Sequence, residues 1–206
     1  MKITKHILTD KIILLRFANE SDVARTFLRF QEHYESPRFA GLVFTHGEFK
    51  RWYKEKFGKF NYYEEWYDGF NIPSSTLKKF YSGEFNPLTK REKIILNLLK
   101  EHDHDYYIIA VHHKEDKSIF RHELAHALFY TEEDYKKAVS GIMEKYDLKK
   151  LEKVLHKVDG YGKHVLRDEI QAYSVACHGE IKSEFPEKMR RDIRKIFDKH
   201  VKKMNL

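Results

Sequence analysis

The spacing of apolar residues in the N-terminal half predicts mostly helices. Ile12–Phe17 is apolar and β-branched and predicts a strand, whereas residues 58–75 are aromatic and irregular and predict a packed loop. Thr45 and Thr89 each stand three residues before a glutamate, which is the pattern of a capping box. An apolar stripe at helical spacing follows each of them, and further helices are expected after Ser21 and over 76–81.

The C-terminal half shows one strand pattern among several helical ones. The continuous apolar run Tyr106–Val111 predicts a strand that is buried on both faces. Together the patterns predict an α+β fold, predominantly helical with a small sheet. A boundary near residue 103 would separate an N-terminal extension, 1–103, from a C-terminal domain, 104–206. The helices expected in this domain begin near Ser118, Thr131, Leu148, His164 and Pro186.

Cysteine and hydropathy narrow the class of protein. A single cysteine, Cys177, excludes a disulfide framework or a cysteine-built zinc ribbon within one chain. The longest apolar run near the N-terminus is Ile12–Leu15, too short for the core of a signal peptide or for a transmembrane helix. We therefore expect a cytoplasmic protein with no membrane association.

The positive charge is concentrated at one end of the chain. Lys and Arg number 39 against 32 Asp and Glu, a net charge of +7, and residues 182–206 alone hold nine basic and four acidic residues. Acidic residues interrupt this basic helix, and a solvated helix face is the usual explanation for such a pattern. The pattern argues against a nucleic-acid partner, although a nucleic-acid-associated protein using this helix remains the alternative class.

The sequence His122-Glu123-Leu-Ala-His126 has the spacing of a zinc-binding helix. Residues i and i+4 lie on one face of a helix about one turn apart, so two imidazoles can bind one Zn²⁺. Glu123 projects beside them and can take a proton from a metal-activated water. Apolar residues flank the motif, so an inward-facing polar stripe would be costly without a partner such as a metal ion.

A catalytic zinc needs a third protein ligand and an open position. Phe129 and Glu132 stand where a metzincin would have Gly and His, which excludes that class. Downstream, a predicted helix carries Glu169 and Tyr173 one turn apart. Considered on residue type and position, four side chains remain candidates for the third ligand: Glu169, His156, His164 and Asp168.

The HELAH motif followed by a helix with the pattern DExxAY resembles the gluzincin metallopeptidases, in particular the soluble minigluzincins. The resemblance covers about residues 106–178, or 73 of 206. It implies a zincin-like fold, His122 and His126 as zinc ligands with Glu169 as the third, and Glu123 as general base. It also implies that Tyr106–Val111 forms the rim of the cleft, where an extended substrate adds to the strand edge.

Tyr173 stands where many larger gluzincins carry an aspartate that orients a zinc histidine. A phenol can accept the same imidazole N–H bond, although more weakly than a carboxylate. Tyr173 is therefore expected to act in catalysis, and it is also a candidate donor to the oxyanion. The other candidates for that donor are Tyr161, His164 and His178.

The sequence thus predicts a zinc-dependent metallopeptidase that hydrolyses peptide bonds through a zinc-activated water and acts on a peptide or protein substrate. Two alternatives concern activity: the basic C-terminal helix could cover the cleft and keep the enzyme latent, or the protein could bind zinc without catalysis. For residues 1–103, a packing layer over the catalytic part is one interpretation and a substrate-selecting lid the other.

Overall fold

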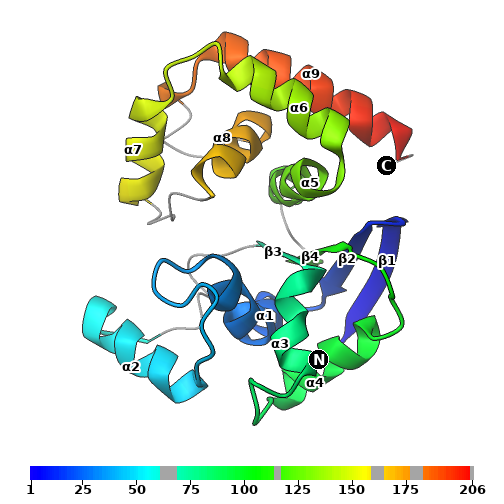
Figure 1. The fold of residues 1–206 in the computed structure, drawn as a ribbon, viewed down its shortest axis with the longest axis vertical. Coiled ribbons are helices and arrows are strands. Elements are labelled where there is room, and N and C mark those ends of the chain that lie inside the picture. Colours follow the sequence, from blue (N-terminus) through cyan, green and yellow to red (C-terminus); the bar gives the residue numbers. More distant parts are fainter. Residues whose placement is uncertain (61–68, 114–116, 159–164, 177–182, 205–206) are drawn as a thin grey trace.

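A four-stranded mixed sheet divides the molecule into two helical layers (Figure 1). The computed structural model describes residues 1–60, 69–113, 117–158, 165–176 and 183–204. The fold is α+β and predominantly helical, as the sequence predicts. The strands are β1 (Ile3–Thr9), β2 (Ile12–Phe17), β3 (Gly69–Pro73) and β4 (Tyr107–His112), and their order in the sheet is β1-β2-β4-β3.

Strand β4 occupies an interior position in the sheet. It pairs parallel with β2 and antiparallel with β3, so both of its edges are hydrogen-bonded to strands of this chain. The expectation that Tyr106–Val111 offers an edge to a substrate is therefore wrong. The edge next to β4 belongs to β3, which lies within the segment predicted to be a loop.

Strand β3 forms because β4 supplies a partner and the layer below supplies a core. Phe70 and Ile72 are fully buried in that lower core, while the alternate residue Asn71 faces the opposite layer and contacts Glu123 there. Proline at the end of the strand, Pro73, is tolerated because this is an edge strand. Because β3 has only five residues and its partner β4 is distant in the sequence, the apolar pattern of this segment alone does not indicate a strand.

The lower layer holds an aromatic core under the sheet. Phe27, Phe30, Phe70 and Phe80 contact one another edge-on or tilted beneath β3 and β4. The capping boxes at Thr45 and Thr89 are present and begin two of the helices, as predicted. The elements of this layer are α1 (Glu20–Glu35), α2 (His46–Phe57), a short 3₁₀ turn (Ser74–Leu77), α3 (Lys78–Tyr81) and α4 (Lys90–Leu99).

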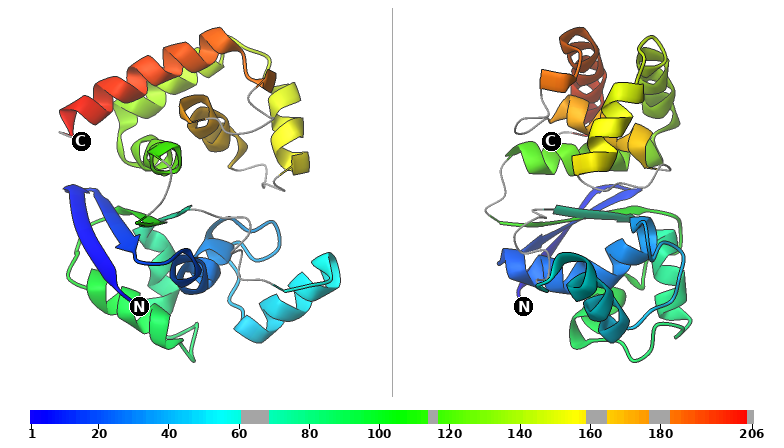
Figure 2. Two further views of the ribbon diagram at one scale, coloured as in Figure 1. Left: turned by 180° about the vertical axis from the view of Figure 1, so that it is seen from behind. Right: turned by 90° about the vertical axis from the view of Figure 1, so that its left-hand side faces the viewer.

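The upper layer covers the other face of the sheet, where Ile12, Leu14, Tyr107 and Ile109 point into a second core. In Figures 1 and 2, α5 and α8 lie nearer the sheet and α6 and α9 lie farther from it. The helices of this layer are α5 (Lys117–Thr131), α6 (Glu133–Met143), α7 (Lys149–Val158), α8 (Leu166–Val175) and α9 (Glu187–Lys203).

Three of the four strands come from residues 1–103 and the fourth comes from the following segment. The two parts therefore share one sheet, and the division at residue 103 stays a prediction. None of the helices in the described ranges is long and apolar enough to cross a membrane.

Candidate metal centre

Helices α5 and α8 bring three potential metal ligands together. His122 and His126 lie one turn apart on α5, and Glu169 lies in the first turn of the neighbouring α8. Buried alanines such as Ala125 and Ala172 let the two helices approach closely. Ligand atoms of the three polar residues lie within 4.8 Å of one another, and among the described residues they form one group that could hold a metal ion.

The distances in this group suit a small tetrahedral cation. The Nε2 atoms of His122 and His126 are 3.1 Å apart, and they lie 3.6 and 3.7 Å respectively from the carboxylate oxygens of Glu169. Two atoms bound to one zinc ion at tetrahedral angles would lie about 3.3 Å apart. Two imidazoles and one carboxylate are also a known donor set for catalytic zinc. The residues present therefore fit the metal.

Asp168 orients one of the two imidazoles. Its Oδ1 lies 2.9 Å from Nδ1 of His126 and also accepts a hydrogen bond from Gln171, 2.9 Å away. Gln171 in turn accepts a hydrogen bond from the hydroxyl of buried Tyr135. An ionised carboxylate can only accept, so Nδ1 of His126 carries a proton, and its Nε2 is the atom directed at the other ligands. Asp168 is thus an orienting residue rather than the third ligand.

The carboxylates around His126 favour the protonated form of its imidazole. Burial alone would lower the pKa of His126, but the charges of Asp168 and Glu169 outweigh it and hold the pKa well above the usual imidazole value. A divalent cation must displace this proton to bind Nε2. Metal affinity is therefore expected to increase with pH.

We expect Asp168→Asn to weaken metal binding by about 10- to 100-fold, because loss of an orienting partner lowers the basicity and fixed orientation of the imidazole. Zinc dissociation constants measured by competition with a chromophoric chelator would test this. The matched control is Asp103→Asn, which removes a fully exposed carboxylate beside His104. Equal affinities of the wild type and Asp168→Asn would contradict the role of Asp168.

Glu123 lies beside the ligand group but is held by the sheet. Its buried Oε2 accepts a 2.5 Å hydrogen bond from Nδ2 of Asn71 on β3, and the hydroxyl of Tyr107 on β4 donates to Oδ1 of the same asparagine. A Cβ atom at Gly69 would lie 2.7 Å from Oε1 of Glu123. Position 69 therefore needs glycine if the carboxylate is to keep this place.

Tyr173 contacts the site through its ring. Its centroid is 4.8 Å from that of His122, with the two planes inclined by 74°, an edge-to-face arrangement. Tyr173 is expected to accept a hydrogen bond from the N–H of a zinc-binding imidazole. At His126 it is Asp168 that accepts this bond. The catalytic role of Tyr173 stays a prediction.

The C-terminal end of α1 adds two residues to the surroundings of the site. Burial and the nearby charge of Glu169 raise the pKa of Glu35 to about 8, and Gln31 donates a 2.6 Å hydrogen bond to it. Tyr34 hydrogen-bonds to Tyr107. Both residues lie in an amphipathic helix some 90 residues before the motif, so nothing local in the sequence indicated them.

The other residues predicted as metal ligands or oxyanion donors do not lie in this ligand group or are outside the described part of the chain. His156 is exposed on α7 and does not belong to the ligand group. Tyr161, His164 and His178, proposed as oxyanion donors or ligands, lie outside the described residues. Of the four candidates for the third ligand, the structure brings Glu169 into the group.

Comparisons with protein-family models, with curated proteins and with solved structures find no match for this chain. Arguments about function therefore depend on the geometry of the site.

Proposed function

We propose that this protein is a zinc-dependent metallopeptidase with a zincin-like, gluzincin-type site. The observation that carries the proposal is that the potential metal ligands and the neighbouring carboxylate of Glu123 are held separately around α5. His122, His126 and Glu169 form a group that could hold a metal ion. The carboxylate of the HELAH motif, Glu123, is kept beside that group by a hydrogen bond from Asn71. A ligand set with an adjacent, separately held carboxylate suits hydrolysis better than a purely structural metal site.

The chain's own residues would contribute as follows. His122, His126 and Glu169 would hold the zinc ion, which when bound polarises a carbonyl group and makes water more acidic. Glu123 would take a proton from the attacking water and deliver it to the leaving amine. The hydrogen bond from Asn71 fixes the carboxylate of Glu123, and the hydrogen bond that the hydroxyl of Tyr107 donates to Asn71 fixes the asparagine.

The register of β3 indicates which of its backbone groups an extended peptide substrate would pair with. The amide of Ser74 donates to the carbonyl of Tyr106, and residues in an antiparallel pair alternate between hydrogen-bonded and non-bonded positions. By this alternation Ile72 turns its backbone groups to β4, whereas Gly69 and Asn71 turn theirs to the outer edge. All five residues of β3 are buried, so a peptide could add at that edge, close to Glu123, only after the part of the protein that covers the edge moves away.

The basic helix α9 gives the nucleic-acid alternative little support. Its buried residues Met189, Ile193 and Phe197 pack in the upper core, and the helix lies beside α6, farther from the sheet than α8 (Figure 2). Arg194 donates to the carbonyls of Ser174 and Val175 at the end of α8. This helix contributes to packing and caps a neighbouring helix.

Metal analysis combined with a cleavage assay tests the proposal. We expect about one zinc ion per chain and cleavage of unfolded protein or fluorogenic peptides that is lost on chelation and restored by zinc. Protein that binds no stoichiometric metal would refute the proposal at its first step. Stoichiometric zinc without cleavage of a broad peptide library would indicate a catalytically silent zinc-binding protein.

A further inference from the structure

A line of polar side chains crosses the upper layer and ends on one of the potential metal ligands. Nδ1 of His126 lies 2.9 Å from Oδ1 of Asp168, and Nε2 of Gln171 donates a 2.9 Å hydrogen bond to the same oxygen. The hydroxyl of Tyr135 donates a 2.8 Å hydrogen bond to Oε1 of Gln171. The ring of His200 packs edge-on against Tyr135, with the centroids 5.2 Å apart. This polar network therefore connects α5 through α8 to α6 and reaches α9, the four helices that lie together in Figure 1.

The middle of the polar network is buried among apolar residues. Tyr135 and Gln171 are both fully buried, and Tyr135 belongs to the upper hydrophobic core. A buried amide or hydroxyl is destabilising unless it is hydrogen-bonded, and apolar side chains of similar shape could fill the same space without that cost. Packing alone therefore gives no reason for these two residue types, whereas their connection to Asp168 does.

The carboxylate at one end of the network sets the direction of its hydrogen bonds. An ionised carboxylate can only accept, so Gln171 turns its amide nitrogen to Asp168 and its amide oxygen to Tyr135. Burial and the charge of Asp168 raise the pKa of Tyr135, so the phenol keeps the proton that it donates. The hydroxyl of Tyr135 thus fixes the amide of Gln171, and that amide in turn fixes the carboxylate of Asp168.

We propose that Tyr135 and Gln171 are positioning residues of the metal centre that act on His126 through Asp168. The inference rests on the proposed zinc site and extends its support to a helix that carries none of the ligands. Because Gln171 and His126 donate to the same oxygen of Asp168, the carboxylate is restrained from two sides. Without the Tyr135 hydroxyl, Oε1 of Gln171 loses its donor, the amide is free to rotate, and the carboxylate loses one restraint.

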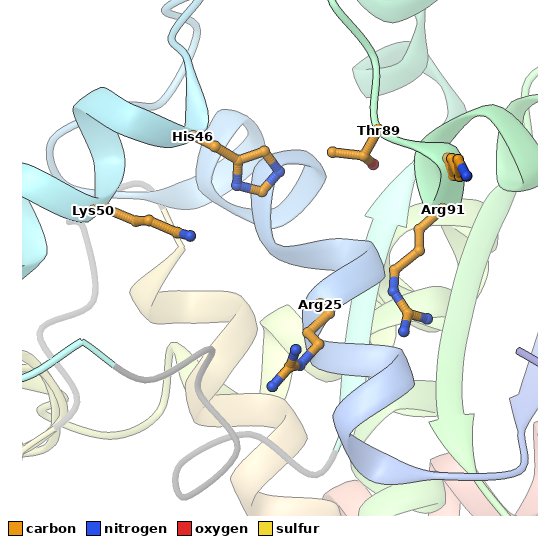
Figure 3. Close-up of a pocket in the computed structure, with 6 residues that line it drawn as sticks. Arg25, His46, Lys50, Thr89 and Arg91 are labelled. Atoms are coloured by element: carbon orange, nitrogen blue, oxygen red, sulfur yellow. The ribbon is translucent and has the colours of Figure 1, made fainter.

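The lower layer offers a matched control away from the polar network. Figure 3 shows a hollow of this layer between α1, α2 and α4, and none of the network's residues is among the described residues that line it. Tyr106 is a buried tyrosine of the lower core, and its hydroxyl donates to the carbonyl of Leu99. Tyr106→Phe therefore removes the same chemical group as Tyr135→Phe from a buried place on the other side of the sheet.

Competition with a chromophoric chelator tests the inference through zinc affinity. We expect Tyr135→Phe to weaken zinc binding by about three- to tenfold and Gln171→Met by about tenfold, since partners of an orienting residue act less directly than the residue itself. Tyr106→Phe should bind zinc as the wild type does. Circular dichroism of the metal-free variants checks that each is folded, and Gln171→Met replaces Tyr135→Phe in all comparisons if the latter does not fold.

The double variant Tyr135→Phe, Asp168→Asn separates positioning from a general loss of stability. If Tyr135 acts through Asp168, its substitution should change zinc affinity by less than about twofold once Asp168 has been replaced, because residues of one network have non-additive effects. An equal loss of affinity with and without Asp168→Asn would overturn the inference.

A measurement on metal-free protein distinguishes failure of this inference from failure of the proposed function. At fixed pH, the NMR signal of the Nδ1 proton of His126, assigned by its absence in His126→Ala, should shift in Tyr135→Phe and stay unchanged in Tyr106→Phe. An unchanged signal in Tyr135→Phe, or wild-type zinc affinity in both Tyr135→Phe and Gln171→Met, would refute the positioning role while leaving the zinc site in place. A wild-type protein that binds no zinc would refute the proposed function and this inference with it.

Discussion

Glu123→Gln is expected to lower peptide cleavage by about 10²- to 10⁴-fold, the range for loss of a general base, while zinc content stays unchanged. Glutamine has nearly the same shape as glutamate, and its carbonyl oxygen can still accept the hydrogen bond from Asn71. It cannot take a proton from water at neutral pH. Because Glu123 lies outside the ligand group, the substitution should leave the metal site intact.

Two measurements together make this prediction sharp. The kcat/KM for a fluorogenic peptide reports the chemical step, and elemental analysis of the same sample reports zinc. Glu133→Gln, an exposed position at the start of α6, is a suitable control and should match the wild type in both. Cleavage by Glu123→Gln at the wild-type rate would show that another group acts as base.

His126→Ala is expected to abolish stoichiometric zinc binding and the stabilisation that zinc gives. In the wild type, saturating zinc should raise the free energy of unfolding by about 4 kcal/mol at a concentration 1,000 times the dissociation constant. The variant lacks one ligand and leaves the half-buried Asp168 without its histidine partner. Thermal unfolding followed by circular dichroism, with zinc and with chelator, would measure the stabilisation by zinc and the loss of stability caused by the substitution itself.

The same variant should also change how stability depends on pH. In the metal-free wild type the pKa of His126 is raised above its value in the unfolded chain, about 6.5. Protonation of His126 therefore stabilises the fold fully below pH 6.5, and this contribution is lost as the pH rises through the raised pKa. In metal-free His126→Ala, this decrease in the free energy of unfolding with rising pH should be absent. Identical pH profiles of the two proteins would contradict the assigned ion pair with Asp168.

The edge strand shows why a short segment can be misassigned from sequence. Gly69–Pro73 begins with glycine and ends with proline, and both are typical of loops. It becomes a strand because β4 offers it hydrogen-bond partners and because Phe70 and Ile72 fill the lower core. Strand β1 likewise carries no clear strand pattern, since none of its residues is buried and its pairing with β2 provides the stabilisation.

The candidate site divides in a similar way. The i, i+4 spacing of His122 and His126 is a property of any helix, so their convergence on one face could be predicted. The partners Asn71 and Glu35 belong to distant segments and follow no spacing rule. Asp168 was visible as a candidate, but its role as the residue that orients His126 depends on how α8 packs on α5.

By itself, then, the amino-acid sequence determined what depends on neighbouring residues: the two capping boxes, the apolar strand β4, the helical stripes and the histidine pair of α5. The tertiary structure decided which strand forms the sheet edge and which carboxylate joins the two histidines in the ligand group. The reason is physical. Local backbone preferences act over a few residues, whereas sheet pairing, helix packing and the gathering of charge depend on segments that meet only when the chain folds.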